Sequence, residues 1–524
     1  MKMFRLILCL LLVGILHVEG AKILMMFNAI SRSHYILGEA LGLGLAEKGH
    51  QVTMISPFKK SNNHTNYEEI ILDDAFDSLL AKEMQKTLLD ANNRSMWKMV
   101  LRMAQIGADG TNKTFYNSGV QKLLRSGKKF DIFLSEWFMN EALLGMANHF
   151  NAIPIVMSTA GTSGWTNKMV GNPFNPAYDI NLILPYTNPL SYRERLISTA
   201  FLVFEELLYW RHMSYQTELY EEYFRFLNGR ARINEPDLYS ITTNISLLLL
   251  NTNVAVSNAR ANVPNVVSVG GLHVKPGKLP NDLQKILDNS PQGVIYFSMG
   301  SNVKSSQLSE ETRTGILRTF AKLNHTVLWK WETDQLPNQP KNVIIKKWMP
   351  QQSILAHPNT KLFVTHGGLL SSIEALYFGV PLVGIPVFGD QPMNMARAVT
   401  SGYGIKLDLN TISEETLTEA IFEALNNPKY RERAQYLSNI FRDQEQEPLD
   451  KAVSSIEYVL RHKGATFLRS ASVHMPVYQK ILLDVMAGLL AAVLLPIFIV
   501  YWIIKKIIKK LCRRSKVNDT KKNN

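Results

Sequence analysis

The chain has 524 residues, enough for two or three domains with separate hydrophobic cores. Its formal net charge of +13 is uneven, because residues 505–524 contain nine Lys or Arg and one Asp. This surplus is typical of a basic tail beside a membrane, so the basic net charge does not argue for a nucleic-acid-binding protein, and no nucleic-acid partner is expected. The only cysteines are Cys9 and Cys512, which excludes disulfides, thiol catalysis and thiolate-bound zinc in residues 21–484.

Both ends of the chain have the composition of targeting segments. Residues 1–20 show the basic start, apolar run and small final residue of a secretory signal peptide, and the run is too short to favour an uncleaved anchor. Residues 485–504 are uncharged and, at about 1.5 Å per residue, span roughly 30 Å, the thickness of a bilayer core. A lysine cluster follows directly, which favours a membrane span over a buried core helix and places the tail 505–524 in the cytosol.

The chain ends in a pattern that resembles the dilysine retrieval signal of endoplasmic reticulum membrane proteins, formed by Lys521 and Lys522. Together with the signal peptide and one span, this pattern predicts a single-pass type I protein of that membrane, with residues 21–484 in the lumen. The luminal sequons are candidates for N-glycosylation and begin at Asn63, Asn93, Asn112, Asn244 and Asn324.

The segment after the signal peptide predicts a βαβ unit. Lys22–Phe27 is expected to be a buried strand, His34–Lys48 a helix capped by Ser33, and Gln51–Ser56 the next strand. This order predicts a parallel sheet with helices on both faces. No G-x-G-x-x-G follows the first strand, which argues against a nicotinamide or flavin cofactor. His34 stands at the carboxyl edge of the sheet, where such folds bind ligands.

A second α/β region follows a linker rich in Gly and Pro at residues 269–280. Within it, Lys361–Thr365 is expected to be a strand that turns through His366-Gly367-Gly368 into the helix Leu369–Phe378. Such a turn exposes backbone N–H groups at the positive end of the helix dipole. The pattern therefore predicts an anion site suited to a diphosphate.

The motifs around this turn resemble those of the UDP-glycosyltransferase family. The family's donor-binding signature is matched by Trp348-x-Pro-Gln351, the His-Gly-Gly turn, Glu374 and Asp390-Gln391. The segments Ser31–His34 and Phe130–Trp137 resemble the family's catalytic segments. The resemblance implies an α/β protein of the GT-B fold, with two facing Rossmann-like domains and one C-terminal transmembrane helix. The domains are expected at 21–268 for the acceptor and 281–450 for the UDP-sugar, with helices in 451–484 leading to the span at 485–504.

The resemblance also implies a role for each matched residue. His34 is expected to accept the proton of an acceptor hydroxyl, and Glu136, where the family has Asp, to hold the imidazole ring. Trp348 is expected to stack on uracil. The other implied donor contacts are Gln351 to the nucleoside, Glu374 to the ribose, Ser301, His366, Gly367 and Gly368 to the diphosphate, and Asp390 and Gln391 to the sugar.

Two departures from the family pattern refine these expectations. Leu370 stands where many relatives have Asn, and the following Ser371 is expected to compensate for that phosphate contact. Asn251 occupies the place of an arginine that is frequent among glucuronate users, which favours UDP-glucose over UDP-glucuronate. Some aromatic residues of the helix Leu196–Arg225 are expected to line an apolar acceptor pocket, and Tyr67–Ala108 to reach this pocket or the membrane surface.

The predicted activity is the inverting transfer of a hexose from a UDP-sugar to a hydroxyl of small lipophilic acceptors, in detoxification. No metal is expected, and the UDP-sugar is a co-substrate rather than a cofactor. Glu136 and Leu370 keep open the alternative of a catalytically weak relative that binds hydrophobic ligands. A biosynthetic enzyme acting on membrane lipid is a further alternative, and a homo- or hetero-oligomer is compatible with the sequence.

Overall fold

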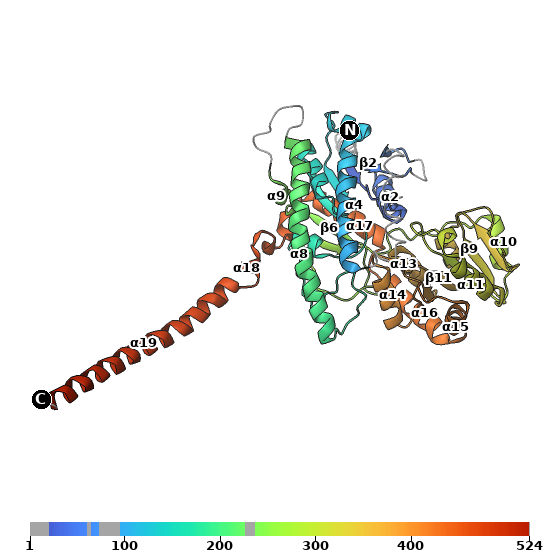
Figure 1. The fold of residues 1–524 in the computed structure, drawn as a ribbon. Coiled ribbons are helices and arrows are strands. Elements are labelled where there is room, and N and C mark those ends of the chain that lie inside the picture. The colour runs from blue at the N-terminus through green and yellow to red at the C-terminus, as the bar shows by residue number, and fades with distance from the viewer. Residues whose placement is uncertain (1–19, 60–63, 73–94, 226–235, 523–524) are drawn as a thin grey trace, which may run out of the picture. The chain divides into compact units, whose positions relative to one another are not determined.

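The computed structural model describes residues 20–59, 64–72, 95–225 and 236–522 (Figure 1). The chain forms two compact units, which meet in sequence between Ser470 and Ala471. The first unit contains two parallel β-sheets with helices on both faces, and the second contains the long C-terminal helix.

Seven strands form the sheet of the N-terminal half. They are β1 (Lys22–Met26), β2 (Gln51–Ser56), β3 (Tyr67–Ile71), β4 (Ile132–Glu136), β5 (Ile153–Ser158), β6 (Leu247–Leu250) and β7 (Val266–Ser268). Their order is β3-β2-β1-β4-β5-β6-β7, and all pairs are parallel, which confirms the predicted parallel sheet. Because β1 pairs with β2 on one side and β4 on the other, the strand order reverses between β1 and β4. Such a switch point is where open α/β sheets bind ligands.

Helices cover both faces of this sheet. They are α2 (Arg32–Glu47), α4 (Met96–Tyr116), α5 (Ser118–Leu124), α6 (Gly145–Phe150), α7 (Gly164–Val170), α8 (Tyr192–Tyr220) and α9 (Leu238–Thr242), with the short turns η2 (Glu141–Leu144) and η3 (Glu221–Arg225). Helix α2 presents a stripe of Leu37, Leu41 and Leu45 to one core cluster. Gly38 lets it approach closely, since a Cβ there would lie 2.7 Å from the Phe27 ring. Helices α5, α6 and α9 contribute to the cluster on the opposite face.

The structure differs from the predicted elements at two places near the ligand-binding edge. Helix α2 begins at Arg32, so its N-cap is Ser31 and the prediction of Ser33 as the cap is wrong. The Pro, Asn and Tyr content of Asn167–Pro189 predicts a long loop, but this segment begins inside α7, because Ser163 forms a capping box with Thr166 that starts the helix at Gly164.

The C-terminal half is built on a six-stranded sheet. Its strands are β8 (Val294–Ser298), β9 (Thr326–Lys330), β10 (Val343–Lys346), β11 (Thr360–Thr365), β12 (Leu382–Gly384) and β13 (Gly404–Lys406). Their order is β10-β9-β8-β11-β12-β13, and every pair is parallel. The sequences of these strands are short, mostly continuous apolar runs, because helices bury both faces of such a sheet. Here the strand order reverses between β8 and β11.

The helices of the C-terminal half pack on both faces of this second sheet. They are α10 (Asn281–Asp288), η5 (Ser305–Gln307), α11 (Glu310–Ala321), α12 (Gln351–Leu355), α13 (Leu369–Tyr377), α14 (Gln391–Thr400), α15 (Glu414–Asn426) and α16 (Pro428–Arg442). The next helix, α17 (Pro448–Arg461), returns to the first sheet. Its buried residues Ala452, Val453 and Ile456 belong to the same core cluster as α2.

The second unit contains η7 (Ala471–His474), α18 (Val477–Lys480) and α19 (Leu483–Lys522), while η6 (Thr466–Leu468) ends the first unit. Residues Leu483–Leu511 of α19 are long and apolar enough to cross a membrane, and the span predicted at 485–504 lies within them. Helix α19 also contains Lys521 and Lys522 of the predicted retrieval signal. The signal peptide predicted at residues 1–20 lies, except for Gly20, outside the described residues.

Candidate active site

Both switch points supply candidate site residues to one cavity of about 1000 Å³ in the first unit. Helix α2 follows β1, so His34 lies at the carboxyl edge of the first sheet, next to the end of β4. The turns after β8 and β11 contain Gly300-Ser301 and His366-Gly367-Gly368 at the corresponding edge of the second sheet. The two sheets thus place side chains of different chemistry around one space.

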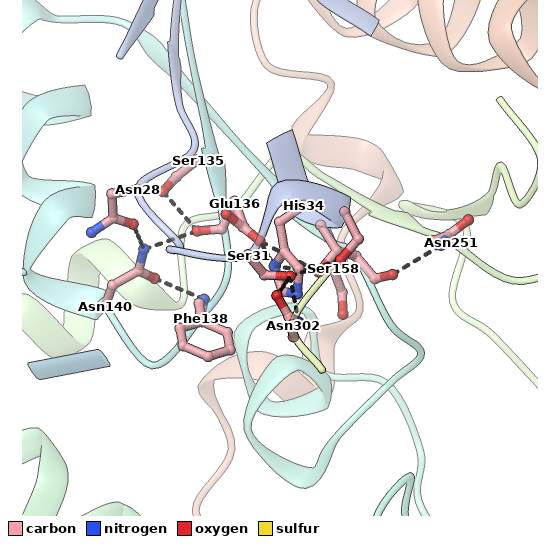
Figure 2. Close-up of polar contacts among 12 residues, drawn as sticks. Asn28, Ser31, His34, Ser135, Glu136, Phe138, Asn140, Ser158, Asn251 and Asn302 are labelled. Carbon is pink, nitrogen blue, oxygen red and sulfur yellow. Dashed lines mark hydrogen bonds and ion pairs between the residues drawn. The ribbon is translucent and has the colours of Figure 1, made fainter. Parts of the chain in front are cut away.

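His34 and Glu136 form a direct ion pair between the imidazole Nδ1 and the carboxylate Oε1 (Figure 2). Glu136 is the last residue of β4 and is fully buried, whereas the His34 side chain is 21% exposed. The Thr159 hydroxyl lies 3.0 Å from His34 Nδ1 and 3.4 Å from Glu136 Oε1. With Nδ1 held by this pair, Nε2 has no hydrogen-bond partner among the described residues and is the nitrogen left for a ligand.

A polar network holds the two loops that position this pair. The Asn140 amide donates to Asn28 Oδ1 at 2.9 Å and to the Glu136 carbonyl at 3.1 Å, and the Phe138 amide donates to Asn140 Oδ1 at 3.0 Å (Figure 2). The ring of Phe138 meets the His34 ring edge to face at 5.4 Å. These contacts tie the ends of β1 and β4 together, and they fix the imidazole between a carboxylate and an aromatic ring.

The charge state of His34 reflects opposing effects. Burial lowers the pKa of the imidazole, but the Glu136 carboxylate and, more weakly, Asp390 outweigh it, so the pKa lies above its usual value. Asp390 belongs to the C-terminal half, so this half contributes to the electrostatics of His34. Asn302, which follows the turn after β8, also donates to Ser31 Oγ at 2.9 Å (Figure 2).

The turn after β11 combines glycines with a neutral histidine. Burial, together with Lys330, lowers the pKa of His366 to about 4, so the ring offers hydrogen bonds rather than charge at neutral pH. The ring lies between two glycines, since a Cβ on Gly300 or Gly368 would approach it to 2.5 Å. Gly367 has a φ of +76°, which glycine adopts without strain.

Helix α13 starts directly after this turn and has no side chain capping its N-terminus. Its first N–H groups and the helix dipole therefore supply positive potential at this edge of the cavity. Lys330, the last residue of β9, adds a formal charge; its ammonium donates to the Gly300 carbonyl, and its side chain lines the cavity. This arrangement suits a phosphate group.

Glu374 of α13 is buried and held on both carboxylate oxygens. Gln351 donates to Oε2 at 2.7 Å, and Gln352 lies 3.2 Å from Oε1. His273 Nε2, from the segment predicted as a linker, lies 3.1 Å from the same Oε1. Gln351 also donates to the Ser371 hydroxyl at 3.2 Å. Three of the predicted donor residues thus form one connected group on the cavity wall.

Trp348 is 57% exposed, which is unusual for a tryptophan and leaves its ring available to a ligand. The guanidinium of Arg32, the first residue of α2, lies 5.0 Å from the centre of this ring. Lys330 lies 5.9 Å from the same ring. The indole is therefore faced by cations from both halves of the unit.

The last predicted pair lies where β12 leads into α14. Asp390 is the N-cap of α14, and Asn394 donates to its carboxylate at 2.7 Å and to the Gly367 carbonyl at 3.0 Å. Gln391 uses Oε1 to accept the backbone N–H groups of Val387 and Phe388. Only its amide N–H groups remain for a ligand, whereas the Asp390 carboxylate keeps free acceptor capacity.

Most of the predicted site residues line this cavity: His34, Ser301, Trp348, Gln351, His366, Gly368, Ser371, Glu374, Asp390 and Gln391. Glu136 lies behind His34, and Gly367 lies within the turn. Leu370, which replaces the family's Asn, lines the cavity and packs against the core cluster of α2 and α17. Its apolar side chain therefore joins the two halves instead of contacting a phosphate.

Asn251 is fully buried and does not line the cavity. Its amide donates to the Thr159 carbonyl at 2.9 Å (Figure 2). In this structure the residue therefore supports the strand end behind His34, and the choice between UDP-glucose and UDP-glucuronate does not follow from a contact it makes.

The cavity wall formed by the N-terminal half differs from the sequence prediction. None of the aromatic residues expected from the long helix lines this cavity, namely Phe201, Phe204, Tyr209, Trp210, Tyr215 and Tyr220. Helix α8 contributes Glu205 instead, and the apolar wall comes from Trp137, Phe138 and Trp165. The spacing of these aromatic residues correctly predicts that they lie on one helix. Most of them, however, pack against α4, α7 or η3 and not against the cavity. From Tyr67–Ala108, Val100 and Met103 of α4 do reach the cavity.

Several functional neighbours were missed from the sequence: Thr159, His273, Lys330, Gln352 and Asn394. Gln352 directly follows Gln351 of the Trp-x-Pro-Gln motif, and His273 lies in the linker predicted at residues 269–280. Both residues are therefore within or next to segments that the sequence analysis had identified. Thr159, Lys330 and Asn394 join the site through contacts with residues far away in the sequence, namely His34, Gly300 and Gly367.

The sequons differ in their surroundings. Asn244 and Asn324 are exposed, and Asn244 accepts a hydrogen bond from Arg469. Asn112 lies inside α4, and its sequon partner Thr114 is fully buried. Asn63 and Asn93 lie outside the described residues.

Known proteins are similar to this chain in sequence or in fold. Residues 21–518 match the family described as "UDP-glucoronosyl and UDP-glucosyl transferase". UDP-glycosyltransferase UGT5 of Dactylopius coccus is 37% identical over 89% of this chain and 88% of its own length. UDP-glucosyltransferase 2 of the same organism is 34% identical over 89% of each. The crystal structure of the glycotransferase of kitacinnamycin, 18% identical, matches 84% of this chain and 99% of its own with a TM-score of 0.55. The two parallel sheets thus have the predicted GT-B arrangement.

Proposed function

Because the chain belongs to the family of UDP-glucuronosyl and UDP-glucosyl transferases and is a UDP-glycosyltransferase, we propose that it transfers glucose, with inversion, to a hydroxyl of small lipophilic acceptors. One observation carries the proposal: the His34–Glu136 pair and the turn before α13 line or flank a single cavity. One half supplies a general base, and the other supplies a site for a diphosphate leaving group.

The base acts through Nε2. Because Nδ1–H donates to Glu136, the Nε2 lone pair accepts the acceptor's hydroxyl proton as the oxygen attacks the anomeric carbon. The bond from that carbon to the UDP oxygen breaks as the new one forms, so the configuration inverts. The buried carboxylate stabilises the imidazolium that results.

The donor half holds the leaving group through charge and backbone dipoles. The diphosphate meets the N–H groups at the start of α13 and the Lys330 ammonium. Trp348 offers its exposed face to uracil, and Glu374, preset by His273, Gln351 and Gln352, accepts the ribose hydroxyls. Asp390, close enough to influence His34, accepts sugar hydroxyls next to the reacting carbon.

Glucose is the proposed sugar because the relative named UDP-glucosyltransferase 2 is 34% identical over 89% of this chain. The test incubates the membrane-bound enzyme with UDP-glucose, UDP-glucuronate or UDP-N-acetylglucosamine and a panel of phenols, with products identified by mass. Glucosides are expected. Products from UDP-glucuronate alone would overturn the choice of sugar, and no product from any donor would favour a hydrophobic-ligand-binding protein.

The proposed location is the endoplasmic reticulum membrane, with the first unit in the lumen. The apolar stretch of α19 and the lysines Lys521 and Lys522 support it. Protease added to sealed microsomes is expected to remove only the tail, and replacing both lysines by serine is expected to move the protein to later secretory compartments. The same replacement at Lys509 and Lys510 is the control.

A further inference from the structure

The acceptor side of the cavity contains a second buried carboxyl group that the proposed reaction does not use. Glu205 of α8 lines the cavity and is 6% exposed. Its Oε2 accepts a hydrogen bond from the Asn181 amide at 2.8 Å. Among the described residues, no hydrogen bond is made to Oε1. One acceptor oxygen of a buried carboxyl group is therefore available beside the cavity.

The residues around Glu205 are otherwise largely apolar. Leu182, Ile183 and Trp165 line the same part of the cavity. The nearby Lys168 does not neutralise the carboxyl group directly, because its ammonium is bound to Glu206 at 2.5 Å. Burial raises the pKa of Glu205 to about 7, while the bond from Asn181 lowers it in part. A polar group in such surroundings is costly unless it is fully hydrogen-bonded.

Two indole rings connect Glu205 to the catalytic pair. Trp137 follows Glu136 directly, and its ring meets that of Trp165 edge to face at 6.1 Å. Trp165 Nε1 in turn donates to the backbone carbonyl of Glu205 at 3.2 Å. Phe138, Trp137 and Trp165 thus form an aromatic wall of the cavity, with Phe138 against the His34 ring at one end and Trp165 against the backbone of Glu205 at the other.

The distance along this wall suits a small molecule. Thr159 contacts His34, and Gly164, five residues later, lies beside Glu205, since a Cβ on Gly164 would be 3.3 Å from Glu205 Oε2. Five residues of extended chain reach at most about 18 Å, which is an upper limit on the separation of the Thr159 and Gly164 backbones, and His34 and Glu205 line the same cavity.

We propose that Glu205 is a specificity-determining residue for the acceptor, whose Oε1 accepts a hydrogen bond from a second hydroxyl group at the end of the molecule remote from the reacting oxygen. This inference rests on the proposed function and names its acceptor class: flat apolar molecules with a hydroxyl at each end. One hydroxyl meets His34 Nε2, the ring system lies along Trp137 and Trp165, and the other hydroxyl meets Glu205.

The test compares two acceptors that differ by one hydroxyl, para,para-dihydroxybiphenyl and para-hydroxybiphenyl. Their binding to the full chain in detergent, saturated with UDP, is measured by calorimetry, which needs no turnover. The wild type is expected to bind the dihydroxy compound about tenfold more tightly, the gain from one hydrogen bond to a buried carboxyl group. Glu205→Met is expected to remove this preference without weakening the monohydroxy compound, and Glu205→Gln, which keeps an acceptor oxygen, to retain part of it.

The control is Glu218→Gln, which changes an exposed carboxylate of α8 outside the cavity lining, and is expected to keep the preference. A wild type without preference, or a Glu205→Met variant that weakens both compounds equally, would overturn the proposal and leave Glu205 as a structural tie to Asn181. Transfer to each compound is measured separately. A preference in binding without any glycoside product would overturn the proposed function but not the role of Glu205.

Discussion

The two sheets of the first unit use their switch points in different ways. Between β1 and β4 the functional groups are side chains, a half-buried imidazole fixed by a buried carboxylate. Between β8 and β11 the turns are glycines packed around a neutral histidine, and the helix N-terminus behind them is uncapped. In the proposed reaction, the first arrangement moves a proton, and the second stabilises charge without moving one. The same topology therefore serves two chemistries, and substitutions should separate them into losses of rate and losses of donor affinity.

The largest expected effect is that of His34→Ala. Loss of the general base is expected to lower kcat by about 10³-fold, within the range such groups contribute. Binding of UDP-glucose, measured by calorimetry, is expected to change less than about threefold, because the donor contacts lie on the other sheet. His357→Ala, which removes a histidine paired with Asp288 outside the cavity lining, is the control. Undiminished turnover in His34→Ala would remove the proposed base.

Glu136→Gln tests whether the pair, and not the histidine alone, sets the chemistry. The base must be neutral, so transfer is expected to fall as the pH drops through the raised pKa of His34. Without the carboxylate, burial dominates and the pKa decreases, so this acid limb is expected to move to lower pH while the maximal rate falls about 10²-fold. The profile of kcat/KM against pH measures both. An acid limb that stays in place would show that another group titrates there.

The difference between the halves also explains what the sequence could reveal. The strands and the glycine turns were predictable because their signals are local: apolar runs, Gly367 with positive φ, and a helix starting at once. The pair of His34 and Glu136 is separated by about a hundred residues in the chain and was inferred from resemblance, and the structure brings the two side chains together.

Features that depend on tertiary packing could not be predicted from the sequence. Helices α4 and α7 cover aromatic residues of α8 and thereby decide which face of α8 lines the cavity. The position of Glu205 in the cavity wall could therefore not be predicted from the sequence. The anchoring of Glu374 by His273 depends on the path of a segment without regular structure. From the sequence, Leu370 was interpreted as a missing phosphate contact. In the structure its side chain packs against the core cluster of the N-terminal half.

Gly368→Ala is the matching test of the donor half. Gly368 has a φ of −61°, which alanine adopts, so the backbone should tolerate the change. The new Cβ would lie 2.5 Å from His366 Nε2 and must displace this ring, which lines the cavity where the diphosphate is proposed to bind. KM for the UDP-sugar is expected to rise about tenfold, with a smaller change in kcat. Gly488→Ala in α19, outside the cavity lining, where a Cβ meets nothing within 4 Å, is the control. A loss confined to kcat would contradict the division of labour between the two switch points.

Trp348→Ala is expected to have the smallest effect, an increase in KM for the UDP-sugar of about fivefold to tenfold, the lower part of what base stacking contributes. The loss should be modest because the ring is 57% exposed and partly occupied by Arg32 before a ligand arrives. Trp348→Phe should recover most of the affinity, since a smaller aromatic face remains. Arg32→Ala separates the two contributions: if the guanidinium competes with uracil for the ring, this variant binds UDP more tightly than the wild type. Weaker UDP binding in Arg32→Ala would instead show that the cation reaches from the first sheet to the nucleotide, and the separation between a catalytic half and a donor half would then be incomplete.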